Sequence, residues 1–279
     1  MTFHNWKGDW VAPQANKAYR DLLSSILEDG GVVTCRGHRC RELMMNDMVV
    51  DLRLPLVTLP ERHLSNRFAA AEAAWVMSGD NRVSSIQPFN SRVAQFSDDG
   101  SRFFGAYGPR VVDQLPHVLG ALERDHYTRQ AVLTIWRPSP PATKDVPCTV
   151  AVQWLYRDGR LHCLDYMRSS DAWLGVPYDL FTFAMLTAGV ALELRRRGLN
   201  VQLGNLYLTA GSRHLYLDKT SFGYDEADVR RVCDAPFVKP NYEPLNLDDF
   251  HDYDDLVAHL WRLARHEPVD KPWLEEVRF

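Results

Sequence analysis

The chain has 279 residues, of which 46% are hydrophobic and 24% are charged, and its formal net charge is −4. This composition is typical of a folded globular protein, so it excludes a collagen-like or largely disordered chain. The slightly acidic balance also argues against a duplex-binding protein, because such proteins usually present a basic face. We therefore expect a single globular domain over residues 1–279 with no nucleic-acid partner.

The sequence predicts neither a membrane-spanning segment nor a metal site. No apolar run approaches the roughly 18 residues that a transmembrane helix needs, and residues 1–6 lack the charged-then-apolar pattern of a signal peptide. The five cysteines form an odd and sparse set, which indicates reduced thiols in a cytoplasmic compartment. Cys35 and Cys40 are not part of a metal-ligand quartet, so we predict no metal.

Periodic apolar patterns predict helices and strands along the whole chain. The expected helices cover residues 15–27, 66–77, 111–123, 180–197 and 254–266. The expected strands cover residues 131–136, 150–156, 161–166 and part of 204–219. Residues 83–99 show no regular pattern.

Four basic or imidazole side chains crowd into a glycine-containing segment, residues 32–43. They are Arg36, His38, Arg39 and Arg41. We interpret this segment as a loop, and a cluster of guanidinium groups in a loop indicates an anion-binding site. A solvated cluster of surface charges is the alternative.

The most informative stretch is residues 147–179. It starts with Pro-Cys-Thr, and two strand-like runs flank an Asp-Gly turn signal at residues 158–159. We predict a β-hairpin that starts just after Cys148 and carries Arg168, Ser169 and Asp171 at its far end. A thiolate needs a positive neighbour to form near neutral pH, and the planar fork of Arg168 suits a phosphate. A buried, inert cysteine is the common alternative.

Three motifs in this chain resemble the thymidylate synthase superfamily. The family has a Pro-Cys nucleophile and then Arg-Ser-x-Asp-x-x-Leu-Gly-x-Pro-Phe-Asn, and residues 168–179 read Arg-Ser-Ser-Asp-Ala-Trp-Leu-Gly-Val-Pro-Tyr-Asp. Residues 72–81 are similar to the family's Glu-Leu-x-Trp-x-x-x-Gly-x-x-Asn, and residues 211–216 to its Gly-Asp-x-His-x-Tyr. Thr149 and Asp179 stand where the family usually has His and Asn. Both departures resemble the deoxycytidylate hydroxymethylase branch.

The resemblance implies an α/β fold of three layers, with a large mixed β-sheet and flanking helices. It also implies a homodimer that forms across the sheet. The resemblance covers about residues 15–225 and is densest from 147 to 179. Residues 238–279 are then a divergent C-terminal extension, in which the family's closing tail is not recognisable.

The resemblance also implies roles for individual residues. The expected catalytic residues are Cys148, Glu72 and Asp179. The expected substrate-binding residues are Arg36, Arg129, Arg168, Ser169, Asp179, His214, Tyr216 and Tyr107. The expected folate-binding residues are Asp171, Leu174, Gly175 and Tyr178. Arg39 or Arg41 could replace Arg36, and Gln130 stands where the family has a second arginine beside the one that crosses the dimer, here Arg129.

Asp179 points to a cytosine base. Cytosine presents an N4 amine that donates and an N3 that accepts, and carboxylates accept from that amine. An ionised carboxylate opposite uracil O4 would place two acceptors against each other, which is a strong kind of rejection. The alternative for Asp179 is that it serves only as a helix N-cap. The alternative for Glu72 is that it lies on the surface of its helix.

These inferences predict a deoxycytidylate 5-hydroxymethyltransferase that uses 5,10-methylenetetrahydrofolate and forms a Cys148 adduct at C6. Residues 83–99 lack the tryptophans that face folate in thymidylate synthases, which fits a site that admits water. The alternatives are CMP as substrate, reductive methylation of dCMP or dUMP, and an inactive nucleotide-binding relative. We expect a cytoplasmic protein, or one of the host cytoplasm if it is phage-encoded.

Overall fold

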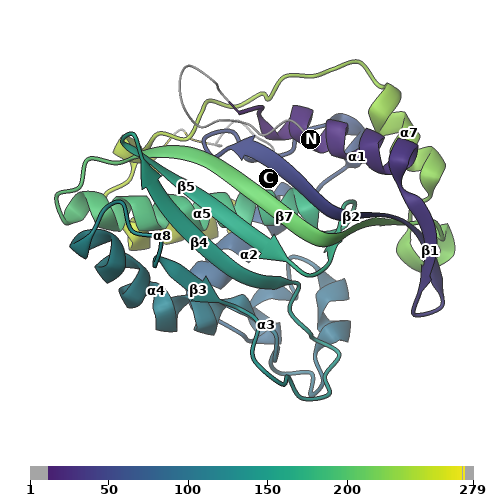
Figure 1. Cartoon of the computed structure of the whole chain (residues 1–279), viewed down its shortest axis with the longest axis horizontal. Helices are drawn as coiled ribbons and strands as arrows, with labels where there is room; N and C mark the ends of the chain where they lie inside the picture. The colour runs from purple at the N-terminus through teal and green to yellow at the C-terminus, as the bar shows by residue number, and fades with distance from the viewer. Residues whose placement is uncertain (1–11, 272, 274–279) are drawn as a thin grey trace.

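A seven-stranded mixed β-sheet organises the fold of the computed structural model (Figure 1). The strands are β1 (Gly31–Cys35), β2 (His38–Asp51), β3 (Val132–Thr134), β4 (Thr149–Arg157), β5 (Arg160–Met167), β6 (Ser170–Asp171) and β7 (Gln202–Tyr216). They lie in the order β1-β2-β7-β5-β4-β3, and β6 pairs with β7. β7 runs parallel to β5 and β6, whereas the other pairs are antiparallel.

The structure describes residues 12–271 and residue 273. Residues 1–6, in which we expected no signal peptide, therefore lie outside the described residues. Residues 272 and 274–279 also lie outside the described residues, so they do not test our expectation that the family's closing C-terminal tail is unrecognisable here.

Helices cover one face of the sheet, and α5 (Val176–Arg196) lies at the centre of that layer (Figure 1). The other helices are α1 (Ala15–Asp29), α2 (Asn66–Met77), α3 (Val83–Ile86), α4 (Tyr107–Arg124), α6 (Lys219–Phe222), α7 (Glu226–Asp234) and α8 (Tyr253–Arg265). Short 3-10 turns cover Pro60–Arg62, Ser91–Phe96 and Leu247–Asp249. α5 is apolar nearly all round and buried along most of its length, as expected of a helix enclosed between a sheet and other helices. The predicted α/β fold with a large mixed sheet and flanking helices is confirmed.

The segment 32–43 is a β-hairpin, so our interpretation of it as a loop was wrong. Cys35 pairs with His38 across a two-residue turn, in which Arg36 and Gly37 have φ angles of 50° and 84°. Turns with two positive φ angles match the twist of antiparallel strands, and the β-branched residues before the turn favour a strand. His38, Arg39 and Arg41 therefore lie in β2. Of the four basic or imidazole residues in this segment, Arg36 is the one that lies in the turn.

Two helices begin four residues earlier than the apolar pattern predicted. α4 begins at Tyr107 and α5 at Val176, and each has a proline in its first turn, Pro109 and Pro177. Proline is tolerated there because the first N–H groups of a helix have no partner inside the helix. Residues 83–99, which showed no pattern, contain α3 and a 3-10 turn.

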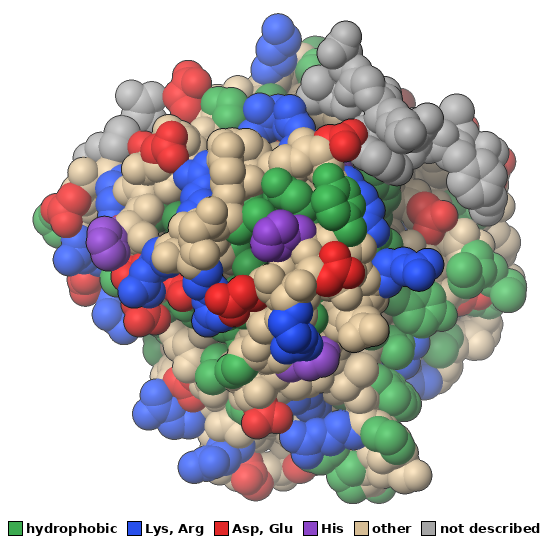
Figure 2. Space-filling model, turned by 60° about the vertical axis from the view of Figure 1, so that its left-hand side comes forward, with side chains coloured by type: hydrophobic (Ala, Val, Ile, Leu, Met, Phe, Trp, Pro, Cys, Tyr) green, Lys and Arg blue, Asp and Glu red, His purple; other side chains and the backbone are tan. Residues whose placement is uncertain are grey.

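Within residues 12–271 and 273, no helix has the length and apolar character that crossing a membrane requires. Figure 2 shows basic and acidic side chains interspersed over the face that it turns forward. That face therefore presents no continuous basic surface of the kind that duplex nucleic acids need.

Candidate active site

The residues singled out from the sequence converge near the N-terminal end of α5. Asp179 lies in the first turn of α5, Cys148 immediately precedes β4, and Glu72 lies on α2. The charge of Asp179 raises the pKa values of both Glu72 and Cys148. The structure thus brings one thiol and two carboxyls together from three segments that are distant in sequence.

Arg168 holds the segment that carries Cys148. Its backbone N–H donates to the carbonyl of Cys148 at 2.9 Å. Its guanidinium donates from Nε to the Pro147 carbonyl at 2.9 Å and from Nη2 to the Val146 carbonyl at 3.0 Å. The same guanidinium lies 5.6 Å from the centre of the Trp136 ring. Arg168 therefore fixes the backbone on the N-terminal side of the thiol with a fork that only arginine provides.

The surroundings of Cys148 favour the protonated thiol at neutral pH. Burial raises its pKa to about 11, while the nearby Arg168 guanidinium acts in the opposite direction. The carboxyls of Asp179 and Asp171 raise the pKa, and Arg36 lowers it. Addition of this sulfur to a substrate therefore has to be accompanied by loss of its proton.

Glu72 and Asp179 form a pair of carboxyls with different proton affinities. Burial raises the pKa of Glu72 to about 8, and the Asp179 charge adds to this effect. Burial also raises the pKa of Asp179 to about 6, which Arg213 counteracts. At neutral pH, Glu72 is therefore mostly protonated and Asp179 mostly ionised, which separates an acid from an acceptor in one site.

Asp179 is not the N-cap of α5. The cap position belongs to Gly175, with no side-chain cap hydrogen bond, and the Asp179 backbone N–H already donates within the helix to the Gly175 carbonyl. The alternative explanation of Asp179 as a cap is therefore wrong. The Oδ2 of Asp179 lies close to Gly175, since a Cβ added at Gly175 would be only 3.2 Å from it.

Two neighbouring strands carry three further predicted residues. Asp171 lies in β6, and His214 and Tyr216 lie in β7. Asp171 pairs with His214 across β6 and β7, and Oδ1 of Asp171 accepts from the backbone N–H groups of Trp173 and Leu174 at 2.8 Å each. The rings of His214 and Tyr216 meet edge to face at 5.1 Å. Tyr216 also hydrogen-bonds Arg36, which raises the pKa of that guanidinium. The hairpin tip thus reaches the same side of the sheet as His214.

Tyr107 fixes the start of β4. Its hydroxyl accepts from the Thr149 N–H at 3.1 Å, one residue beyond Cys148. Burial raises the pKa of Tyr107 well above its usual range, and the nearby Cys148 adds to the effect. Tyr107 therefore stays a neutral hydroxyl beside the thiol.

The remaining predicted residues lie around this centre. Leu174 is 42% exposed, and the Tyr178 hydroxyl accepts from the Ser65 N–H at 3.3 Å. Ser169 is half-buried between β5 and β6. Arg129 is exposed in the loop before β3, and its carbonyl accepts from Gln153 at 2.7 Å. Gln153 is five residues along β4 from Cys148, about 16 Å at 3.3 Å per residue, so Arg129 does not join the centre of its own chain.

Two buried charged residues were missed by sequence reasoning. Arg213 and Asp165 lie in β7 and β5 and have 0% and 1% of their surface exposed. Arg213 lowers the pKa of Asp179, and the charge of Asp179 raises the pKa of Asp165. The available signal for Asp165 was a charged residue flanked by apolar residues in a strand, which is costly to bury unless it is paired or functional.

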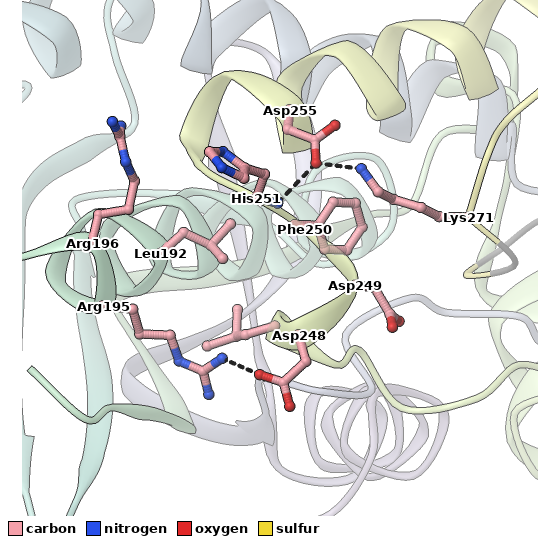
Figure 3. A pocket seen from close by; sticks show the side chains of 10 residues that line it. Leu192, Arg195, Arg196, Asp248, Asp249, Phe250, His251, Asp255 and Lys271 are labelled. Carbon is pink, nitrogen blue, oxygen red and sulfur yellow. Dashed lines mark hydrogen bonds and ion pairs between the residues drawn. The ribbon is translucent and has the colours of Figure 1, made fainter. Parts of the chain in front are cut away.

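A separate cavity of about 630 Å³ lies at the other end of α5 (Figure 3). It is lined by Leu192 and by two ion pairs, Arg195 with Asp248 and Asp255 with Lys271. Leu192 lies about 20 Å along the helix axis from Asp179, at 1.5 Å per residue. This cavity therefore does not belong to the cluster around Cys148. Among the described residues, no group of three His, Cys, Asp or Glu side chains could hold a metal ion.

Comparisons with known proteins match this arrangement. A sequence model of the family described as thymidylate synthase matches residues 17–260. A relative from Bacillus phage SP01, named deoxyuridylate hydroxymethyltransferase, is 30% identical over 236 residues. That alignment covers 77% of this chain, and the chain spans 60% of the length of the relative. Because the family model covers most of the sequence and includes every residue of the cluster around Cys148, the chain belongs to the thymidylate synthase family.

Proposed function

We propose that this protein transfers a one-carbon unit from 5,10-methylenetetrahydrofolate to C5 of deoxycytidylate, with hydration to the 5-hydroxymethyl product. The observation that carries the proposal is the position of Asp179. Its side chain is half-buried, its charge raises the pKa values of Cys148 and Glu72, and it does not occupy the cap position of α5. A carboxylate in that position accepts from the N4 amine of cytosine.

The chemistry assigned to this chain begins at Cys148. The sulfur loses its proton and adds to C6 of the pyrimidine, which gives C5 the character of a carbanion. C5 then bonds to the one-carbon unit that the folate co-substrate supplies. After the C5 proton is lost, the bond between the one-carbon unit and the folate nitrogen breaks, which releases tetrahydrofolate and leaves an exocyclic methylene. Water adds to this methylene, and cleavage of the bond between C6 and sulfur restores the thiolate. Glu72, whose pKa of about 8 lies close to neutral pH, manages the proton transfers through water.

Three residues of this chain are suited to the nucleotide phosphate. Arg36 lies at the tip of the β1–β2 hairpin, and Arg168 and Ser169 lie between β5 and β6. Arg36 can recognise phosphate through two parallel N–H donors. The Nε and Nη2 of Arg168 already donate to the Pro147 and Val146 carbonyls, so Arg168 offers its remaining N–H groups and its charge. Arg129 is assigned to the site of a second copy, because it lies apart from Cys148 in its own chain. His214 and Tyr216 are assigned to the sugar, and Tyr107 to the wall of the base pocket.

The turn before α5 suits the folate ring. Leu174 offers exposed apolar surface next to the carboxylate of Asp171, with Gly175 and the Tyr178 ring following in the chain. A pterin has a flat apolar face and N–H donors on one edge, so it needs this combination of groups.

A second substrate, deoxyuridylate, is favoured by one observation. The phage relative is named for hydroxymethyl transfer to deoxyuridylate. A protonated Asp179 carries one donor and one acceptor, and uracil pairs with that combination. Because cytosine also presents one donor and one acceptor, a protonated Asp179 is compatible with both substrates.

The test is a competition followed by mass spectrometry. The purified protein is incubated with formaldehyde-loaded tetrahydrofolate and equal amounts of dCMP, CMP and dUMP. We expect dCMP to gain one CH2O unit, while the matched Cys148→Ala protein binds dCMP and produces nothing. A product on dUMP alone would replace the proposed substrate, and turnover by Cys148→Ala would exclude the covalent route.

A further inference from the structure

Asp145 connects the segment that carries Cys148 to the start of α4. Its Oδ2 accepts from the Gly105 N–H at 2.6 Å, across 40 positions of the sequence. Gly105 lies two residues before Tyr107, the first residue of α4. Hydrogen bonds to an ionised acceptor are shorter and about twice as strong as those between neutral groups. This contact therefore ties together two segments that both contribute to the cluster around Cys148.

Gly105 is fixed at both of its backbone polar groups. Its N–H donates to Asp145, and its carbonyl accepts from Nη1 of Arg110 at 3.0 Å. Nη2 of the same guanidinium donates to the Phe104 carbonyl at 2.8 Å, and Arg110 is buried. Because Arg110 belongs to α4, it holds Gly105 in place relative to that helix. Gly105 is therefore a rigid attachment point for Asp145.

The two segments approach so closely that position 105 leaves no room for a side chain. A Cβ added at Gly105 would lie 2.4 Å from the carbonyl oxygen of Asp145, which is a backbone atom and cannot rotate away. The contact thus depends on the absence of a Cβ at Gly105 and on an acceptor at Asp145. Each requirement can be removed separately by one substitution.

Two attachments to the segment 105–107 flank Cys148 in the chain. Asp145 lies three residues before the cysteine, and one residue after it the Thr149 N–H donates to the Tyr107 hydroxyl at 3.1 Å. Arg168 donates to the two carbonyls that follow Asp145 in the chain. A nucleophile has to be held within about 0.5 Å of its productive position by its surroundings. The contacts of Asp145 and Arg168 meet this need on the N-terminal side of the sulfur.

The loop that precedes Cys148 has another attachment, farther from the cysteine. Asp98 accepts from the Lys144 N–H at 3.0 Å and from the Thr143 hydroxyl. Asp98 is exposed, whereas Asp145 is half-buried. Asp98 therefore holds the same loop by a similar pair of contacts, but without a printed contact to the segment 105–107, and it provides a matched control.

We propose that Asp145 is a positioning residue for the nucleophile, because its hydrogen bond to Gly105 holds the Cys148 sulfur where it can add to the base. This inference rests on the proposed function, since it assumes that Cys148 is the nucleophile. Asp145 acts through the backbone of residues 145–148.

The test compares Asp145→Ala, Asp145→Asn and Gly105→Ala in steady-state kinetics and in binding of dCMP by calorimetry without folate. Asp145→Ala removes the acceptor, and Gly105→Ala pushes the two segments apart. Both should lower kcat about tenfold or more, while the dissociation constant of dCMP stays close to that of the wild type. Asp145→Asn keeps an acceptor oxygen for the Gly105 N–H, so its kcat should stay close to that of the wild type.

Alkylation of Cys148 by iodoacetamide at pH 8 gives a readout that needs no substrate. Mass spectrometry follows the peptide that carries Cys148, because the chain has five cysteines. Burial raises the pKa of this thiol, and a loosened segment should expose the thiol to water. Alkylation should therefore be several times faster in Asp145→Ala and Gly105→Ala than in the wild type or Asp145→Asn.

The control variant Asp98→Ala should leave kcat, dCMP binding and alkylation unchanged. An equal loss of kcat in Asp98→Ala would mean that any loosening of the loop is sufficient, which would overturn the particular role of Asp145. A kcat that falls as far in Asp145→Asn as in Asp145→Ala would mean that the charge matters and not the hydrogen bond, which would also overturn the inference.

The outcomes separate the two proposals. A wild type that hydroxymethylates no nucleotide would overturn the proposed function, and the alkylation rates would still decide whether Asp145 holds Cys148. Wild-type kcat and alkylation in Asp145→Ala would overturn the role of Asp145 alone. If Asp145→Ala does not fold, Gly105→Ala separates the same two segments and leaves the Asp145 side chain in place. Wild-type values in that variant would count equally against the inference.

Discussion

Desolvation raises the pKa values of both Glu72 on α2 and Asp179 on α5, and the Asp179 charge raises the pKa of Glu72 further. The protein gains an acid and an acceptor from this arrangement, because the two pKa values differ by about two units. Keeping such groups buried costs stability, as is common for catalytic sites. The cost has a pH dependence that can be measured.

Glu72→Gln should be more stable than the wild type, by a margin that grows with pH. The pKa of Glu72 is raised from 4.5 to about 8 in the folded state. The unfolded chain therefore ionises first, and the folded state loses stability as the pH rises from about 4.5 to 8. The margin should reach on the order of a few kcal/mol at pH 8 and vanish near pH 4.

Urea denaturation of both proteins at pH 5, 6, 7 and 8 measures this margin. Glu28→Gln, at an exposed position of α1, is the matched control. A margin that stays constant across the pH range would show that Glu72 ionises normally in the folded protein. Turnover should be lost in Glu72→Gln even though the protein is more stable.

Arg168→Lys should lose turnover more than stability. Lysine cannot place two N–H donors on the Pro147 and Val146 carbonyls as the Arg168 fork does. The Cys148 backbone should then shift, and a displacement of about 1 Å can cost about a hundredfold in rate. Steady-state kinetics and thermal melting measure the two effects, with the exposed Arg124→Lys as control. An unchanged kcat would show that Arg168 does not position the thiol.

At the scale of elements, the contact between α5 and α8 depends on a glycine. A Cβ added at Gly189 would lie 2.5 Å from the ring of Tyr253, whose hydroxyl is held by the Met77 carbonyl at 2.9 Å. The ring therefore cannot move away without loss of that hydrogen bond. Close packing here lets α8 cover α5 and α2 together.

Gly189→Ala should destabilise the protein by about 1–3 kcal/mol, the usual cost of overpacking. Gly120→Ala is the matched helix-interior control. An added Cβ at Gly120 meets only the flexible end of Arg124, at 3.3 Å, so the higher helix propensity of alanine should stabilise that variant by up to about 1 kcal/mol. Chemical denaturation of both variants gives the two values. Equal signs would contradict the packing argument.

The sequence predicted the parts of the site that lie in continuous motifs. The patterns after Cys148 predicted the hairpin that leads to Arg168, because local patterns carry that information. The helix was predicted only from residue 180, so the first turn that carries Asp179 was not predicted. Arg213 and Asp165 were missed because their relation depends on the parallel pairing of β5 with β7. In the chain, α5 lies between β5 and β7, and the two strands pair only when α5 packs against the sheet. No local sequence pattern contains that information. Arg36 was predicted to lie in a loop because a two-residue hairpin turn requires a positive φ angle at this arginine. Such an angle is uncommon for a residue other than glycine.

At the scale of the whole molecule, the sheet has one uncovered face. In the part of the chain that the structure describes, no helix lies over the face turned to the viewer in Figure 1. Tyr166 of β5 and Met44 of β2 are 41% and 80% exposed. We expect a second copy to cover this face of the sheet, as the family resemblance implies.

The dimer can be tested through the division of residues between two chains. If Arg129 contributes to the site of its partner, Arg129→Ala and Cys148→Ala homodimers should both be nearly inactive. A mixture that exchanges subunits forms heterodimers, in which one site receives Cys148 from one chain and Arg129 from the other. We expect turnover to reappear on mixing and to approach a quarter of the wild-type rate, because about half of the dimers are mixed and each has one complete site. Recovery of turnover requires an interface that brings Arg129 within reach of the phosphate bound to the opposite chain. If light scattering shows a stable dimer and turnover does not recover on mixing, Arg129 lies outside the site.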